Sequence, residues 1–169
     1  MEIIDFNGTG RWSQQSILER YAAYARRLKV SPLLDLSPME QEEKNRRWVY
    51  PVMFEVVKGI EKGDKACIEI GVEFIEEDGL FRFGKTIKSN TARALRRAVL
   101  DLDQVTRIRK RVVHMLIAGH VPLEYREYSK LLRKVGMGDW WPLIEEKTNL
   151  NNPHVLRYYK YFEQYVRPQ

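Results

Sequence analysis

One long stretch, Ser89–Ala118, constrains the fold of this chain more than any other part of its sequence. At about 100° per residue, its aliphatic side chains gather on one side of a helix and most of its arginines on the other. Ser89, Asn90 and Thr91 offer N-terminal caps, and Gly119 offers a C-terminal stop. The pattern predicts one amphipathic helix of roughly 43 Å. Because so long a helix is unusual, we consider a kink near Asp101–Asp103.

The arginine face of this predicted helix has two possible roles. A charge-rich helix face is ordinarily a solvated outer surface, and the alternative is a surface that binds nucleic acid, phosphate or an acidic protein. The candidates for anion or partner binding are basic residues of this helix and of the next one, namely Arg93, Arg96, Arg97, Arg107, Lys110, Arg111, Arg126 and Lys130.

Arg109 differs from the other arginines because it projects near the middle of the apolar side. An unpaired buried charge is costly, so a buried arginine needs an acidic partner. We therefore expect Arg109 to pair with a carboxylate, with Glu69, Glu73 or Asp101 as candidates. The alternative is that its aliphatic stem crosses apolar surface while its guanidinium reaches water.

Five further helices follow from capping and periodicity. Residues 13–29 carry an apolar stripe, and Ser37-Pro38-Met39-Glu40 combines a cap, a first-turn proline and a glutamate three residues after the cap. We expect the helix that begins there to divide near Pro51 and to end at Gly63. The other three begin at Val121-Pro122, at Asp139 and at Asn152-Pro153, and residues 1–12 are expected to be an irregular lead-in.

Residues 65–88 fit two structures. As a helix over residues 64–78, capped by Asp64, the segment places its glutamates on one face, and an aromatic loop Leu80–Lys88 follows. As a β-hairpin at about 66–87, it alternates apolar and polar residues and turns at Asp78-Gly79. We favour the helix, and hence an all-α fold of six or seven helices, packed as a compact bundle or as stacked helical hairpins in a single domain over residues 13–169. An α+β fold is the alternative.

Composition bounds the class of protein. The chain has 169 residues, of which 44% are hydrophobic and 31% charged, as in globular proteins that need no disulfide or metal to fold. The only cysteine, Cys67, favours a reducing compartment. No secretory signal or membrane-spanning stretch is evident, so we expect a cytoplasmic protein without a membrane partner. The net charge of +6 is concentrated in residues 82–134, which would steer anionic partners.

The sequence contains no recognisable catalytic or cofactor motif. Its three histidines lack metal-ligand spacing, and it has no phosphate-binding loop or dinucleotide glycine pattern. We therefore expect a non-catalytic interaction or scaffold module without a cofactor, acting through a protein partner or by self-association. The alternative is a nucleic-acid-binding regulator that uses the arginine face of helix 89–118. An enzyme built from dispersed residues is a third hypothesis.

Overall fold

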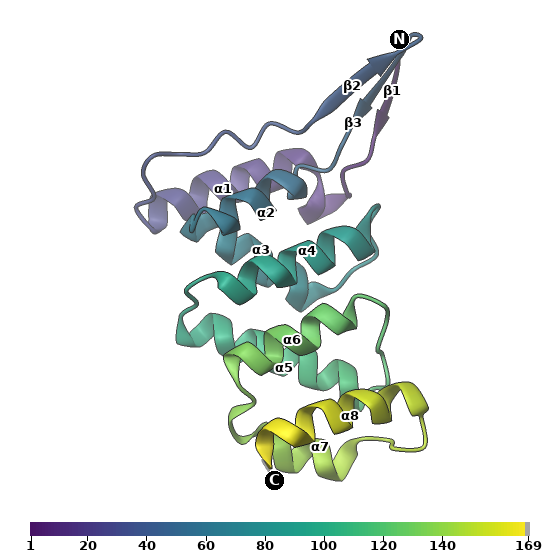
Figure 1. Ribbon diagram of the computed structural model, residues 1–169. Coiled ribbons are helices and arrows are strands. Elements are labelled where there is room, and N and C mark those ends of the chain that lie inside the picture. The colour runs from purple at the N-terminus through teal and green to yellow at the C-terminus, as the bar shows by residue number, and fades with distance from the viewer. Residues whose placement is uncertain (168–169) are drawn as a thin grey trace. The chain divides into compact units, whose positions relative to one another are not determined.

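The computed structural model describes residues 1–167, which form two compact units, Met1–Val99 and a second unit that begins at Leu100 (Figure 1). Helices dominate both units, which confirms the predicted helical fold, and a small three-stranded sheet belongs to the first unit. No helix within residues 1–167 is both long and apolar enough to cross a bilayer. The single domain expected over residues 13–169 stays a prediction, because compact units are not necessarily separate domains.

The first unit packs four α-helices below the sheet (Figure 1). Helix α2 packs against α3 and α4, α3 packs against α4, and α1 packs against α3. Its fully buried side chains include Ile17, Met53, Ile60, Ile75 and Ile87. The elements in chain order are β1 (Glu2–Asp5), the 3-10 helix η1 (Gly10–Trp12), α1 (Gln14–Arg27), β2 (Glu40–Glu43), β3 (Arg46–Val49), α2 (Met53–Glu61), α3 (Lys65–Glu77) and α4 (Gly84–Arg97).

The helix predicted from Ser37-Pro38 is wrong, because this segment forms the β2–β3 hairpin. Lys44 and Asn45 have φ angles of 48° and 65°, as a two-residue type I′ turn requires. Strand β3 also pairs in parallel with β1, so the order is β1-β3-β2, and residues 1–12 are not irregular throughout. The segment 40–47 has no apolar helical face to bury, so a helix there would gain little from packing.

Helix α3 confirms the helical alternative for residues 64–78, and the β-hairpin at 66–87 is wrong. The Asp64 carboxylate accepts a hydrogen bond from the Cys67 amide at 2.9 Å and caps the helix as predicted. The helix ends at Asp78, whose φ of 45° is left-handed. The expected aromatic loop is shorter than Leu80–Lys88, because α4 already begins at Gly84.

A buried ionic cluster joins α1 to α3. Glu73 is 8% exposed and accepts hydrogen bonds from Arg20 and from the Tyr24 hydroxyl, while Arg11 lies 3.2 Å from the same carboxylate. Burial raises the pKa of Tyr24, and the hydrogen bond to Glu73 raises it further. At least part of the predicted glutamate face therefore packs on cations within its own unit instead of facing water.

The long helix predicted over residues 89–118 is wrong, because α4 ends at Arg97 and α5 (Leu102–Ile117) begins anew. Asp101 and Gln104 form a capping box, with hydrogen bonds of 2.8 and 3.1 Å between each side chain and the other residue's amide. Val99 is 92% exposed, although the helical pattern placed it in the core. Ser89, Asn90 and Thr91 lie inside α4 and do not cap its start.

The second unit consists of α5, α6 (Tyr125–Val135), the 3-10 helix η2 (Gly138–Trp140), α7 (Trp141–Lys147) and α8 (Pro153–Val166). Helix α5 packs against α6 and α7, and α6 packs against α8. Tyr125, Tyr128 and Phe162 are fully buried among aliphatic residues such as Ile108 and Leu116. The predicted cap at the start of α8 is confirmed, since the Asn152 side chain accepts from the amides of His154 and Val155.

The carboxylate partner predicted for Arg109 is wrong. Its half-buried guanidinium donates from Nε to the Gly136 carbonyl and from Nη2 to the Val135 carbonyl at 2.6 Å. These oxygens belong to the C-terminal end of α6, where carbonyls lack partners within the helix and carry partial negative charge. Within residues 1–167, the carbonyl oxygens at the end of α6 therefore take the place of the expected carboxylate as the hydrogen-bond acceptors of Arg109.

Candidate anion-binding groove

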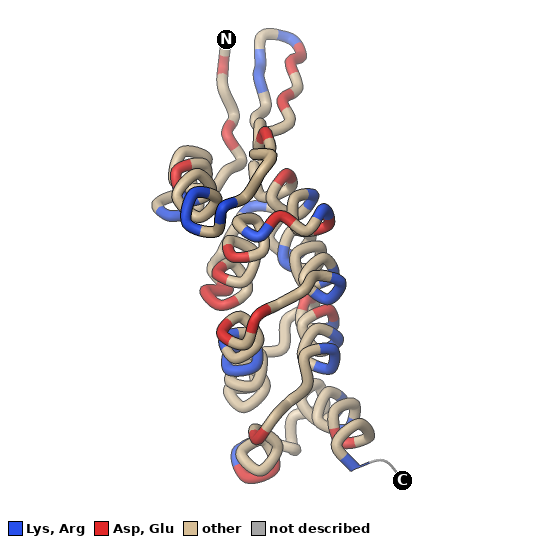
Figure 2. The backbone as a smooth tube through the Cα atoms, turned by 90° about the vertical axis from the view of Figure 1, so that its left-hand side faces the viewer, with Lys and Arg blue, Asp and Glu red and all other residues tan. Residues whose placement is uncertain are grey.

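Lys and Arg positions occur along the helices of both units (Figure 2), so the distribution of charge along the chain does not by itself define a site. Basic side chains line a pocket of about 140 Å³ between α6 and α8 in the second unit. We call this surface the α6–α8 groove. It is lined by Arg126, Ser129, Lys130, Arg157, Tyr158 and Tyr161.

The spacing of polar residues on both helices produces this groove. On α6, residues 126, 129, 130 and 133 follow helical spacing and share one face, while Leu131 and Leu132 are buried. On α8, Val155 and Phe162 anchor the helix in the core. Their burial leaves residues 157, 158 and 161 at the edge that faces α6.

Two arginines, Arg126 and Arg157, line the groove together with Tyr158. Burial raises the pKa of Tyr158, whereas the positive charges of Arg157 and Arg126 act to lower it, because a nearby cation favours the ionised phenolate. Both arginines are exposed, and neither forms an ion pair with any residue of the described chain, 1–167. The groove therefore holds two arginine cations with unused hydrogen-bond donors.

The neighbouring cations of the groove already have partners. Lys130 lies 3.3 Å from a carboxylate oxygen of Glu127. Arg133 donates to the hydroxyls of Tyr161 and Tyr165 at 3.3 and 2.8 Å, and its guanidinium lies 4.5 Å from the centre of the Tyr165 ring. The contact with Arg133 holds Tyr161 at the edge of the groove, and Arg126 and Arg157 remain as the groove's arginines without a partner in residues 1–167.

The chemistry of this lining suits binding of an anion. Arginine presents a planar fork of donors that matches carboxylate and phosphate oxygens, and tyrosine adds apolar contact area with a polar end. The Ser129 hydroxyl donates to the Arg126 carbonyl at 2.8 Å, so its hydrogen is already used within α6.

The structure brings only Arg126 and Lys130 of the predicted basic residues into this groove. Of the others, Arg93, Arg96 and Arg97 lie on α4 in the first unit, and Arg107, Lys110 and Arg111 lie on α5 in the second. Arg107 lies 3.4 Å from Asp103 one turn earlier. The break between α4 and α5 removes the single continuous arginine face, and a binding role for these residues stays a prediction.

Sequence reasoning missed Arg157 and the contribution of Tyr158 and Tyr161. The aromatic stripe of α8 is typical of a core or self-association surface. The signal available was the basic residue next to that stripe, yet its pairing with α6 depends on tertiary packing between helices about thirty residues apart.

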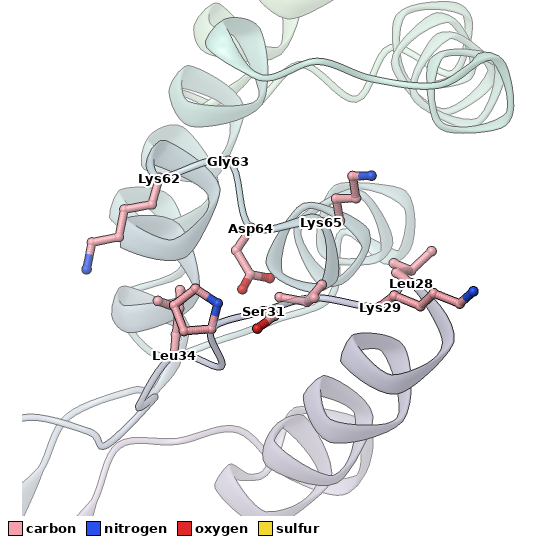
Figure 3. A pocket seen from close by; sticks show the side chains of 10 residues that line it. Leu28, Lys29, Ser31, Leu34, Lys62, Gly63, Asp64 and Lys65 are labelled. Carbon is pink, nitrogen blue, oxygen red and sulfur yellow. The ribbon is translucent and has the colours of Figure 1, made fainter.

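The first unit contains a second pocket, of about 400 Å³, at the end of α1 and the turn between α2 and α3 (Figure 3). Its three lysines, Lys29, Lys62 and Lys65, extend outward in different directions. This pocket therefore does not present converging cations.

The chain matches no protein-family model, no curated protein and no solved structure.

Proposed function

We propose that this protein is a non-catalytic interaction module that binds an acidic segment of a partner protein in the α6–α8 groove. The observation that carries the proposal is the pair Arg126 and Arg157, two unpaired guanidiniums of the described chain at a pocket edged by tyrosines. Arginine and tyrosine are the residues that most often dominate binding energy at protein interfaces. A cytoplasmic location belongs to the same proposal and rests on the single free thiol, Cys67.

A carboxylate-bearing peptide fits the size and the lining of this site. The pocket volume of about 140 Å³ is that of one side chain, not of an extended ligand. A glutamate or aspartate that enters it would receive charge-assisted hydrogen bonds from one or both arginines, and flanking apolar residues would contact Tyr158 and Tyr161. Self-association through an acidic segment of a second copy is one form of the same interaction.

Nucleic acid is the second candidate ligand, and the half-exposed tyrosine rings beside arginines favour it. Bases stack on such rings while cations contact the backbone phosphates. The division of the predicted arginine face between two helices argues for the peptide, because a long phosphate-binding surface on one helix is no longer available.

Fluorescence polarisation with a labelled peptide of alternating acidic and aromatic residues, and with labelled single- and double-stranded oligonucleotides, tests the proposal. Binding is measured at about 50 and 200 mM salt, where phosphate contacts lose much of their affinity. The double variant Arg126→Gln/Arg157→Gln should weaken peptide binding about tenfold, since exposed charged hydrogen bonds contribute less than buried ones.

The matched control is Arg26→Gln/Lys85→Gln, which removes the same charge from exposed residues of the first unit. It should change peptide affinity less than about threefold, as expected for exposed, screened charges that do not line the groove. Equal losses in both double variants, or no peptide binding at the lower salt, would contradict the proposal. Groove-dependent binding of oligonucleotides alone, lost at the higher salt, would favour the second candidate.

A further inference from the structure

The pocket of about 400 Å³ in the first unit has the volume of a small-molecule site and has no part in the α6–α8 groove. Three separate stretches of chain form it: the end of α1, the following loop to Leu34, and the turn between α2 and α3 (Figure 3). Its lining residues are Leu28, Lys29, Val30, Ser31, Pro32, Leu34, Lys62, Gly63, Asp64 and Lys65.

A carboxylate held by hydrogen bonds, that of Asp64, lines this pocket. Asp64 is 8% exposed and accepts hydrogen bonds from the Cys67 amide at 2.9 Å and from the Tyr21 hydroxyl at 2.8 Å. The Tyr21 oxygen accepts in turn from the Leu34 amide at 2.9 Å. Burial and the hydrogen bond to Asp64 raise the pKa of Tyr21 to about 12, so its hydroxyl keeps the proton that it donates.

These bonds orient the Asp64 carboxylate without exhausting it. A carboxylate offers about four acceptor positions, so it retains capacity for a donor that enters the pocket. In Figure 3 the carboxylate points toward the Ser31 side chain, which also lines the cavity. A buried carboxylate beside a hydroxyl is suited to an ammonium group, which is a donor without acceptor capacity.

The rest of the pocket is apolar inside and cationic outside. Leu28, Val30, Pro32 and Leu34 supply apolar lining. The lysine side chains extend away from the Asp64 carboxylate (Figure 3), and within residues 1–167 none of the three forms an ion pair. The lining therefore combines one nearly buried carboxylate with three lysine side chains that point outward.

This arrangement of charge discriminates among ligands. A simple anion would be attracted by the lysines but repelled by Asp64, and a simple cation would be attracted by Asp64 but repelled by the lysines. We propose that the pocket binds a small aliphatic zwitterion, whose ammonium group reaches Asp64 and whose carboxylate pairs with either Lys62 or Lys65. This inference is independent of the proposed function, because it concerns another unit and another kind of ligand.

Titration of the ¹⁵N-labelled full chain with 6-aminohexanoate, followed by amide chemical shifts, tests the inference. Hexanoate and hexylamine are the matched probes that each lack one charge. We expect 6-aminohexanoate to shift the amides of Ser31, Leu34 and Lys65, and each single-charge probe to bind at least about fivefold more weakly because one charged contact is lost.

Two variants assign the charges. Asp64→Asn keeps a side chain that caps helices well but removes the negative charge, and it should weaken 6-aminohexanoate at least about tenfold. Lys62→Gln/Lys65→Gln should weaken the binding of 6-aminohexanoate about threefold, as expected for exposed charges. The difference in affinity between 6-aminohexanoate and hexylamine should become smaller, because hexylamine has no carboxylate. Arg26→Gln/Lys85→Gln, which removes the same charge outside the pocket, should leave the affinity unchanged.

Unshifted spectra up to about 10 mM ligand, a range that detects millimolar affinity, would overturn the inference. Hexylamine or hexanoate binding as tightly as 6-aminohexanoate would also overturn it. So would unchanged affinity in an Asp64→Asn protein whose amide spectrum elsewhere matches that of the unmodified chain. None of these outcomes bears on peptide binding in the α6–α8 groove.

Discussion

Removal of the Glu73 carboxylate should expose how strongly the ionic cluster between α1 and α3 depends on both of its charges. The side chains of Glu73 and Arg20 are 11% and 16% exposed, so neither group regains full hydration when its partner is lost. The Arg20 Nε atom is already buried without a hydrogen-bond partner. A Glu73→Met substitution would leave a nearly buried guanidinium without its main counter-charge.

The expected cost is about 3–5 kcal/mol, the range found when one partner of a buried ion pair is removed. The hydrogen bond from Tyr24 to Glu73 is lost as well. With a typical urea m-value near 2 kcal/mol/M, the unfolding midpoint should fall by roughly 1.5–2.5 M. The Arg20→Met/Glu73→Met double variant should be no less stable than Glu73→Met alone, because an apolar pair of similar volume replaces both charges.

Equilibrium urea unfolding, followed by circular dichroism, measures these differences. Lys58→Met is the control, since its exposed pair with Glu55 should contribute about 0.5 kcal/mol or less. The reasoning would be refuted if Glu73→Met cost less than about 1 kcal/mol, or if the two substitutions were additive in the double variant.

Three further substitutions test the helix cap, the packing and the pH dependence. Asp101→Ala should lower the free energy of unfolding in urea by about 1 kcal/mol, because it removes the capping box of α5. Asp101→Asn should lower it less, since asparagine also caps helices. Equal losses of stability in the two variants would contradict the role of the cap. Gly59→Ala should cost about 1–3 kcal/mol, because its Cβ would lie 2.3 Å from the Cys67 sulfur; Gly79→Ala, where no atom lies within 4 Å, is the comparison. The pKa of Tyr21 is raised in the folded state to about 12, so the stability that it contributes is present below its ordinary pKa near 10 and is lost as the pH rises toward 12. Ultraviolet titration should show this late ionisation, and in Tyr21→Phe that part of the alkaline loss of stability should be absent.

Capping residues and apolar periodicity predicted several helices well, because both act within a few residues of the chain. The caps at Asp64 and Asn152 and the stripe of α1 fall where the sequence placed them. The same local patterns gave a wrong prediction for residues 40–47, because a helix and a β-hairpin satisfy them equally well. On a helix, Glu42 and Glu43 would each lie four residues before an arginine, Arg46 and Arg47 respectively. In the β2–β3 hairpin the same charges pair across the strands, with Glu42 opposite Arg47 and Glu43 opposite Arg46.

The break after α4 shows the limit of periodicity as a guide. Ala98 and Val99 continue the helical stripe from Leu95 toward Leu102, although Val99 is exposed in the structure. The decisive signal was Asp101 followed three residues later by Gln104, a capping-box spacing that marks a new helix start. Periodicity predicts which side of a helix is apolar, and capping decides where the helix begins.

The candidate sites were harder to predict because tertiary packing creates them. Arg126 and Lys130 were among the predicted binding residues, but their proximity to Arg157 requires that α6 pack against α8. The carboxylate of Asp64 was recognised as a helix cap, whereas the pocket above it depends on a loop more than thirty residues earlier in the chain. Local patterns do not specify such long-range contacts.

The parallel pairing of β1 with β3 has a consequence for synthesis of the chain on the ribosome. Glu2 pairs with Arg46, so the first strand emerges long before its partner. At translation rates of about 5–20 residues per second, β1 waits roughly 2–9 seconds with its backbone unpaired. During that interval its isoleucines, Ile3 and Ile4, belong to an open strand edge, which is the kind of surface that joins nascent chains on neighbouring ribosomes. The residue that ends this vulnerable interval is Val49, the last of β3.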